Sequence, residues 1–241
     1  MVREENLRKK TERNPEESPH AFMQGGEMYL KTDKEIRDAI NGLEFTAREL
    51  LITMKELRIE DMYFMSVVDK SLKLIDPFLF AYRTKNIDVM AVLTRIQMDC
   101  VMRTFALSLV ENSSDFCKNV LYEHMEVHRL KDKRNRKLDD KYMCERLGEY
   151  LKLPVYQLYQ LTCEFIHFSS RSFNRIAKIE DDNHFSLFVS KKNRPEDAKE
   201  YRRLSKELAN QFYYFGYVLQ NNLLQAWLDQ LEREAQQLEN Y

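Results

Sequence analysis

Apolar residues recur at every third or fourth position through most of the chain, which is the spacing of amphipathic helices. The clearest run begins at Thr32, which forms a capping-box pattern with Glu35. Its apolar positions are Ile36, Ile40, Leu43, Ala47, Leu50, Met54 and Leu57. A second helix is expected over 59–75, after which Asp76-Pro77 caps a short continuation or kinks it.

The middle of the chain contains the most apolar segment. Residues 88–110 are apolar nearly all round, which predicts a central helix of a bundle. Three further helices are expected over 113–128, 139–151 and 156–169. Residues 172–190 show the alternation of a short β-hairpin.

A last helical pattern runs from Pro195 almost to Tyr241, with Gly216 as its bending point. A straight helix of this length would span roughly 65 Å, so we expect it to kink, to project or to pack along a partner. Its end carries the 4-3-4-3 apolar spacing of a coiled coil. This seam consists of Leu224, Leu228, Leu231, Ala235 and Leu238. It predicts a homo-oligomer or partner-protein interface, or a helix that folds back on its own bundle.

Composition supports a mostly α chain. Gly and Pro number only five each among 241 residues, far below the usual share, which argues against a turn-rich β-sandwich or barrel. Glycine-rich phosphate loops are absent as well, and we expect no cofactor. The predicted organisation is a flexible arm at 1–30, a helical bundle at 31–222 and a C-terminal helix extension at 223–241.

Charge and cysteine content add limits on location and partners. The formal net charge is −1, so any electrostatic site must be local. Four cysteines without CxxC spacing favour reduced thiols and a cytoplasmic protein. The charged N-terminal residues predict no secretory signal. Three charged residues in the segment 89–110 argue against a membrane span.

One polar stripe crosses the predicted central helix. Arg95, Asp99 and Arg103 stand four residues apart, so Asp99 can reach both arginines. The stripe is either a structural ion-pair network or an anion clamp in which two guanidinium groups bind phosphate.

A second cluster ends the predicted helix at 156–169. His167 stands four residues after Cys163 and just before Ser169, Ser170 and Arg171, so it could act as a general acid or base. The alternative is a structural histidine at a helix end, and Cys163 is less suited to nucleophilic chemistry because it lies mid-helix.

The predicted helix at 113–128 carries two histidines and one cysteine, which are residue types that bind metal ions. His124 and His128 have the spacing of two helical ligands and share a face with Cys117, but no fourth ligand follows, and we predict no metal.

A basic stretch follows at 129–137. It holds Arg129, Lys131, Lys133, Arg134, Arg136 and Lys137. These six cations are either a solvated loop or contacts for nucleic-acid phosphates.

The stretches LTRIQMDCVMRTF and YQLTCEFIHFSSRSF resemble a group of uncharacterised bacterial α-helical proteins. More distantly they resemble HEPN-type helical bundles, several of which are ribonucleases of toxin and phage-defence systems. The HEPN motif is an Arg followed by four to six residues and a His, and here only Arg13 to His20 fits it. His167 with Arg95 and Arg103 could replace that motif if folding brings the two helices together.

The resemblance implies an RNA-directed, metal-independent ribonuclease or an RNA-binding component of such a system. Its expected catalytic residues are His167, Arg95, Asp99 and Arg103, and the basic stretch is its expected nucleic-acid contact. The alternative is a non-catalytic helical interaction protein that acts as a homo-oligomer or as a subunit of a complex.

Overall fold

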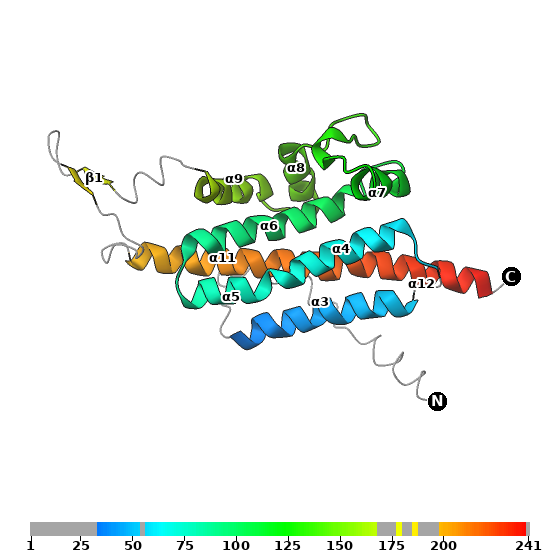
Figure 1. The fold of residues 1–241 in the computed structure, drawn as a ribbon, viewed down its shortest axis with the longest axis horizontal. Coiled ribbons are helices and arrows are strands. Elements are labelled where there is room, and N and C mark those ends of the chain that lie inside the picture. The colour runs from blue at the N-terminus through cyan, green and yellow to red at the C-terminus, as the bar shows by residue number, and fades with distance from the viewer. Residues whose placement is uncertain (1–32, 54–55, 168–176, 180–184, 188–197, 240–241) are drawn as a thin grey trace.

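The computed structural model describes residues 33–53, 56–167, 177–179, 185–187 and 198–239 (Figure 1). Within these ranges the prediction of a mostly α fold with a long C-terminal helix is confirmed. The arm predicted at 1–30, with Arg13 and His20, lies outside the described residues.

The helices follow the apolar periodicity of the sequence. They are α3 (Asp33–Thr53), α4 (Ile59–Lys73), α5 (Ile75–Arg83), α6 (Ile87–Ala106), α7 (Ser113–Leu121), η1 (Val127–Arg129), α8 (Asp140–Leu151), α9 (Val155–Ile166), α11 (Ala198–Val218), η3 (Leu219–Leu224) and α12 (Gln225–Glu239). Two strands, β1 (Ala177–Ile179) and β2 (Phe185–Leu187), pair antiparallel inside the segment predicted to form a hairpin.

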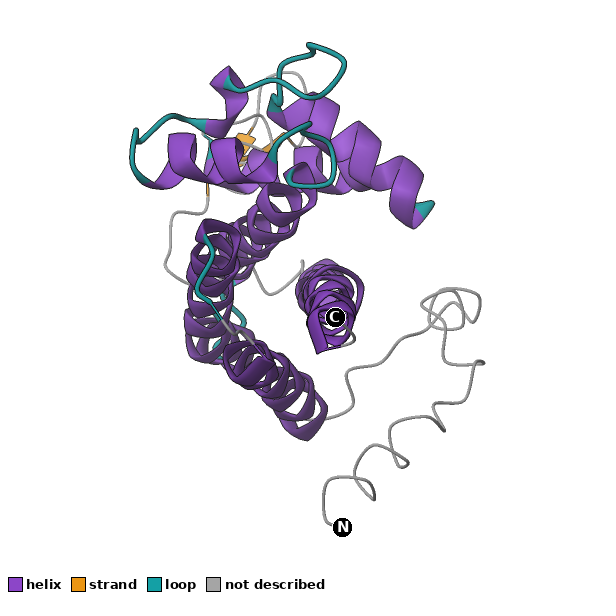
Figure 2. Cartoon of the chain, turned by 90° about the vertical axis from the view of Figure 1, so that its right-hand side faces the viewer, coloured by secondary structure: helices purple, strands orange, loops and turns teal. Residues whose placement is uncertain are grey.

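The C-terminal helices form a rod that the other helices surround on one side. Figure 2 shows α11 and α12 in the hollow of a curved layer made by α3, α4, α5 and α6. The short helices α7, α8 and α9 lie on the outer side of that layer, where α8 and α9 pack on α6 and α7 packs on α4. As predicted from its sequence, α6 is therefore the central helix, buried between α11 and the short helices.

The predicted helix at 113–128 is too long. The described helix α7 ends at Leu121, because the N–H groups of Tyr122 and Glu123 both bond to the Lys118 carbonyl oxygen. His124 then adopts a left-handed backbone conformation with φ 52°. A left-handed residue terminates a right-handed helix, so the chain turns away before η1.

The C-terminal rod is not bent at Gly216. It instead passes through the π-helical turn η3 at 219–224, where one widened turn absorbs the change of register between α11 and α12. A Cβ at Gly216 would lie 3.5 Å from Nε2 of Gln97, which is an ordinary van der Waals contact. The packing of α11 on α6 therefore does not require a glycine at this position.

The leucine seam of the rod is covered by the chain itself. Leu224, Leu228 and Leu231 are buried and join the same core as residues of α3, α4, α6 and α8. The indole N–H of Trp227 donates to Asp61 at 2.8 Å, and Arg58 pairs with Glu234 at 2.8 Å. Of the two roles predicted for the seam, the structure shows the fold-back one. An interface between chains through these leucines would require α12 to leave the bundle.

The packing does not stop at the predicted domain boundary at 222/223, since Leu219 and Leu224 belong to one core. In the described ranges, no helix has the length and apolar character needed to cross a membrane.

Candidate functional site

The polar stripe of α6 is taken up in an ion-pair network. The Arg95 side chain is only 9% exposed, and it ion-pairs with Asp99 one turn later. The expected link from Asp99 to Arg103 is replaced by one from α8. Asp140 lies 3.4 Å from Nη2 of Arg95 and 3.0 Å from Nη2 of Arg103, so it bridges the two arginines.

Tyr159 of α9 completes this network. Its hydroxyl donates to Asp140 at 2.5 Å, and the Arg95 guanidinium lies 3.7 Å from the centre of its ring. Two arginines therefore face two carboxylates and one phenol, and their charges balance. We call Arg95, Asp99, Arg103, Asp140 and Tyr159 the arginine network.

Burial, hydrogen bonds and neighbouring charges shift the pKa values of three groups in the arginine network. Burial alone would raise the pKa of Asp140, but the Tyr159 hydrogen bond and the two arginines hold it below its usual range. Burial and the hydrogen bond to Asp140 raise the pKa of Tyr159 well above its ordinary value. Burial would lower the pKa of Arg95, yet Asp99 raises it. General acid–base catalysis needs a pKa near the working pH, and these three groups do not supply one.

His167 is exposed at the C-terminal cap of α9, where its backbone N–H donates to the Cys163 carbonyl oxygen at 3.1 Å. The side chain of Cys163, one turn before His167, hydrogen-bonds with Arg95, and Tyr159 lies eight residues before His167, roughly 12 Å along the helix. Among the described residues, no hydrogen bond or ion pair joins His167 to Arg95, Asp99 or Arg103. Ser169, Ser170 and Arg171 lie outside the described residues, and the catalytic role of this set stays a prediction.

The residues considered for a metal do not share a helix face. Because α7 ends at Leu121, His124 and His128 lie beyond it in separate turns, and His128 pairs with Glu126. Burial raises the pKa of the Cys117 thiol to about 12, which keeps it protonated. In the described ranges, no group of three or more His, Cys, Asp or Glu side chains could hold a metal ion.

The basic stretch forms an ordered turn, which we call the basic loop (residues 129–137). All six of its cationic side chains are exposed. Lys131 and Lys137 face each other in a single β-bridge, and the Asp132 N–H donates to the Arg136 carbonyl at 2.8 Å. Asn135 takes the left-handed conformation, with φ 61°, that closes the turn. The Lys133 N–H donates to the Leu109 carbonyl at 3.1 Å and ties the loop to the chain that follows α6.

One buried carboxylate holds the basic loop together. Asp132 accepts hydrogen bonds from the N–H groups of Arg134 and Arg136, at 2.9 and 2.8 Å, and from the Tyr142 hydroxyl at 2.6 Å. Burial alone would raise the pKa of Asp132, but these three bonds hold it below its usual range. The Arg136 guanidinium stacks 4.2 Å from the centre of the Tyr142 ring. The loop therefore presents its cations from a fixed backbone.

Three of the six cations have partners for their side chains. Arg129 pairs with Glu126 at 3.2 Å, Lys131 donates to Asn135, and Arg136 stacks on Tyr142. In contrast, the side chains of Lys133, Arg134 and Lys137 have no hydrogen-bond, ion-pair or ring partner among the residues that the structure describes. These three are available to neutralise phosphates.

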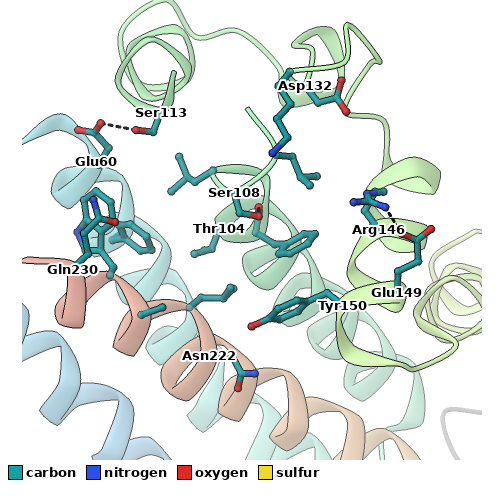
Figure 3. A pocket seen from close by; sticks show the side chains of 18 of the residues that line it. Glu60, Thr104, Ser108, Ser113, Asp132, Arg146, Glu149, Tyr150, Asn222 and Gln230 are labelled. Carbon is teal, nitrogen blue, oxygen red and sulfur yellow. Dashed lines mark hydrogen bonds and ion pairs between the residues drawn. The ribbon is translucent and has the colours of Figure 1, made fainter. Parts of the chain in front are cut away.

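A cavity of about 860 Å³ opens beside the basic loop (Figure 3). Arg146 and Glu149 of α8 lie on one side of it, and Glu60 and Ser113 lie on the opposite side. Its lining also includes apolar and aromatic side chains from α4, α6, the turn that follows α6, α8, η3 and α12. They are Phe64, Phe105, Leu107, Leu109, Tyr142, Tyr150, Leu223, Ala226 and Trp227.

Sequence reasoning did not find this cavity. Its walls come from segments between 58 and 230, and no short motif joins them. The one residue type in the sequence that could have drawn attention to this cavity is tryptophan, because Trp227 is the only tryptophan of the chain and lines the cavity. Comparisons with family models, curated proteins and solved structures give no match to this chain. The HEPN resemblance therefore rests on the helix sequences alone, and function must be argued from the geometry of the site.

Proposed function

We propose that this protein is an RNA-binding component that contacts RNA phosphates through the basic loop. One observation carries the proposal: Lys133, Arg134 and Lys137 are exposed without an internal counter-charge on a loop fixed by Asp132. Because the backbone of the loop is already ordered, phosphate binding does not have to order it, and the cations release counterions from the nucleic acid. A toxin or phage-defence setting follows from the resemblance only.

The geometry supports binding better than cleavage. Arg95 and Arg103 already share Asp140, so a phosphate would have to displace a carboxylate that both arginines contact. His167 lies about two helical turns from Tyr159, and no hydrogen bond or ion pair among the described residues joins it to Arg95 or Arg103. RNA binding through the basic loop requires neither the displacement of Asp140 nor a movement of α9 that would bring His167 to the two arginines.

The alternative of a non-catalytic interaction protein has one observation in its favour. Phe45 and Ile52 are large apolar side chains exposed on α3 seven residues apart, and Leu51 next to them is exposed too. Positions seven apart share a helix face. An RNA-binding subunit of a complex would combine both roles.

Replacing Lys133, Arg134 and Lys137 together with Ser should weaken binding of mixed-sequence single-stranded RNA by roughly tenfold or more at low salt. The logarithmic salt slope should also become shallower by about two units, because each single-strand phosphate contact contributes about 0.7. Fluorescence anisotropy titrations between about 50 and 200 mM salt measure both quantities.

The matched control changes Lys199, Arg202 and Arg203 to Ser. These residues are exposed on α11, near the end of the rod opposite to α12, and the change in net charge is the same. We expect the control to bind nearly as the unchanged protein does. Equal losses in both variants, or no RNA binding by the unchanged protein at low salt, would contradict the proposal.

Asp132→Ala should weaken RNA binding although it removes a negative charge beside the RNA. If net charge alone determined the affinity, Asp132→Ala would bind RNA more tightly than the unchanged protein, because it carries one negative charge less. Without the carboxylate, the N–H groups of Arg134 and Arg136 and the Tyr142 hydroxyl lose their shared acceptor, and the loop loosens. Asp132→Asn keeps one acceptor oxygen and should restore part of the affinity. Tighter binding by Asp132→Ala would show that the loop does not need this anchor.

A further inference from the structure

The cavity beside the basic loop combines two kinds of surface. Lys133 and Arg134 of the loop line it, and so do the aromatic side chains of Phe105 and Tyr150. The Tyr150 side chain is 51% exposed, and its ring leans on the Phe105 ring with centroids 5.4 Å apart. One part of the wall is therefore cationic, and another part offers an accessible ring.

The carboxylates of the cavity are already engaged. Glu60 accepts from Ser113 at 2.8 Å and from Ser114 at 2.5 Å, Glu149 pairs with Arg146, and Asp132 anchors the loop. The two arginines of the wall are engaged as well, since Arg58 pairs with Glu234 and stacks on Trp227, and Arg146 pairs with Glu149. Lys133 and Arg134 are the cations of the wall whose side chains have no partner among the described residues, and they favour an anionic ligand.

From this arrangement, and resting on the proposed function, we propose that the cavity receives one unpaired nucleobase of the RNA strand whose phosphates lie on the basic loop. The ring of Tyr150, backed by Phe105, stacks on the base. Lys133 and Arg134, which line the same cavity, hold the flanking phosphate. The volume of about 860 Å³ lies within the usual range of ligand pockets.

This assignment makes the protein selective for single strands. In an A-form duplex the bases are stacked and paired, so none can enter a side cavity without being extruded. Proteins that bind single strands commonly combine a cationic track with aromatic side chains on which bases stack. Here the loop supplies the cations and α8 supplies the exposed ring.

The test compares oligouridylate with an abasic ribose-phosphate strand of equal length. Both carry the same phosphates, so the basic loop treats them alike, but only one has bases. Oligouridylate should bind roughly 5- to 100-fold more tightly, since one base stacked on an aromatic side chain contributes a factor of this size. It should also change the fluorescence of Trp227, the only tryptophan, which lines the cavity.

Tyr150→Leu should remove most of the preference for oligouridylate and leave the affinity for the abasic strand unchanged. Tyr122→Leu is the matched control, because Tyr122 is also an exposed tyrosine and does not line the cavity. Circular dichroism confirms that both variants are folded.

The outcomes separate the two proposals. If the abasic strand binds the unchanged protein as tightly as oligouridylate and both need the basic loop, the base site is overturned while RNA binding through phosphates stands. If neither strand binds at low salt, the proposed function fails and the base site fails with it. Equal affinity for duplex and single-stranded RNA would also overturn the base site.

Discussion

Replacing Arg95 with Ala should lower the free energy of unfolding by about 2–4 kcal/mol. The change removes the ion-pair partner of Asp99, one of the two arginines on Asp140 and the cation stacked on Tyr159. Breaking a fully buried pair costs roughly 3–5 kcal/mol, and the lower range is expected here because Asp99 and Asp140 are partly exposed. The melting temperature should fall by roughly 5–15 °C.

Urea and thermal unfolding measure this loss, and Arg48→Ala is the control. Arg48 pairs with Glu44 on the exposed face of α3, so its removal should cost less than about 1 kcal/mol. RNA binding by Arg95→Ala at low temperature should stay near that of the unchanged protein, because the basic loop does not contact Arg95.

The same variant tests the catalytic hypothesis drawn from the sequence. Metal-free cleavage of mixed RNA is measured for the unchanged protein, Arg95→Ala and His167→Ala. The ribonuclease hypothesis would be established by three results together. The unchanged protein cleaves RNA, Arg95→Ala stays stable but no longer cleaves, and His167→Ala is inactive.

Apolar periodicity predicted the helices well because burial of one face is what forms them. The central helix was predicted at 88–110 and lies at 87–106. The error at α7 has a local cause. Glu123 and His124 are residue types that a helix accepts, and no Gly or Pro between 113 and 128 indicates a helix end. In the structure, however, the N–H of Glu123 bonds to the Lys118 carbonyl oxygen and His124 takes a left-handed conformation, which ends the helix.

The candidate site was only partly visible in the sequence. The i, i+4, i+8 spacing identified Arg95, Asp99 and Arg103, because one helix places them on one face. Their partners Asp140 and Tyr159 come from other helices, and a single sequence carries no sign of such pairings. The six cations of the basic loop were likewise visible, whereas the role of Asp132 as their anchor depends on Tyr142, ten residues away in the next helix.

Leu228→Glu should destabilise the fold by about 4 kcal/mol or more, which is a large share of a typical domain's stability. Leu228 is 2% exposed in the core shared by α12, α4 and α6, so the variant loses apolar packing and places a carboxylate in an apolar core. A coiled-coil seam between chains predicts a different result, namely a lower molecular mass with an intact bundle. The two views of the C-terminal helix are therefore separable in one variant.

Unfolding in urea, light scattering and tryptophan emission together decide between these views. Trp227 precedes Leu228, and its ring packs on Phe64 with centroids 5.0 Å apart, so detachment of α12 should shift its emission to the red. Gln237→Glu is the control, because it adds the same charge at an exposed position of α12 and should change neither stability nor emission. If Leu228→Glu instead unfolds at the same urea concentration as the unchanged protein and only its mass falls, α12 joins two chains and does not close its own core. The red shift with loss of stability is expected, because Leu224 and Leu231 are buried in that core as well.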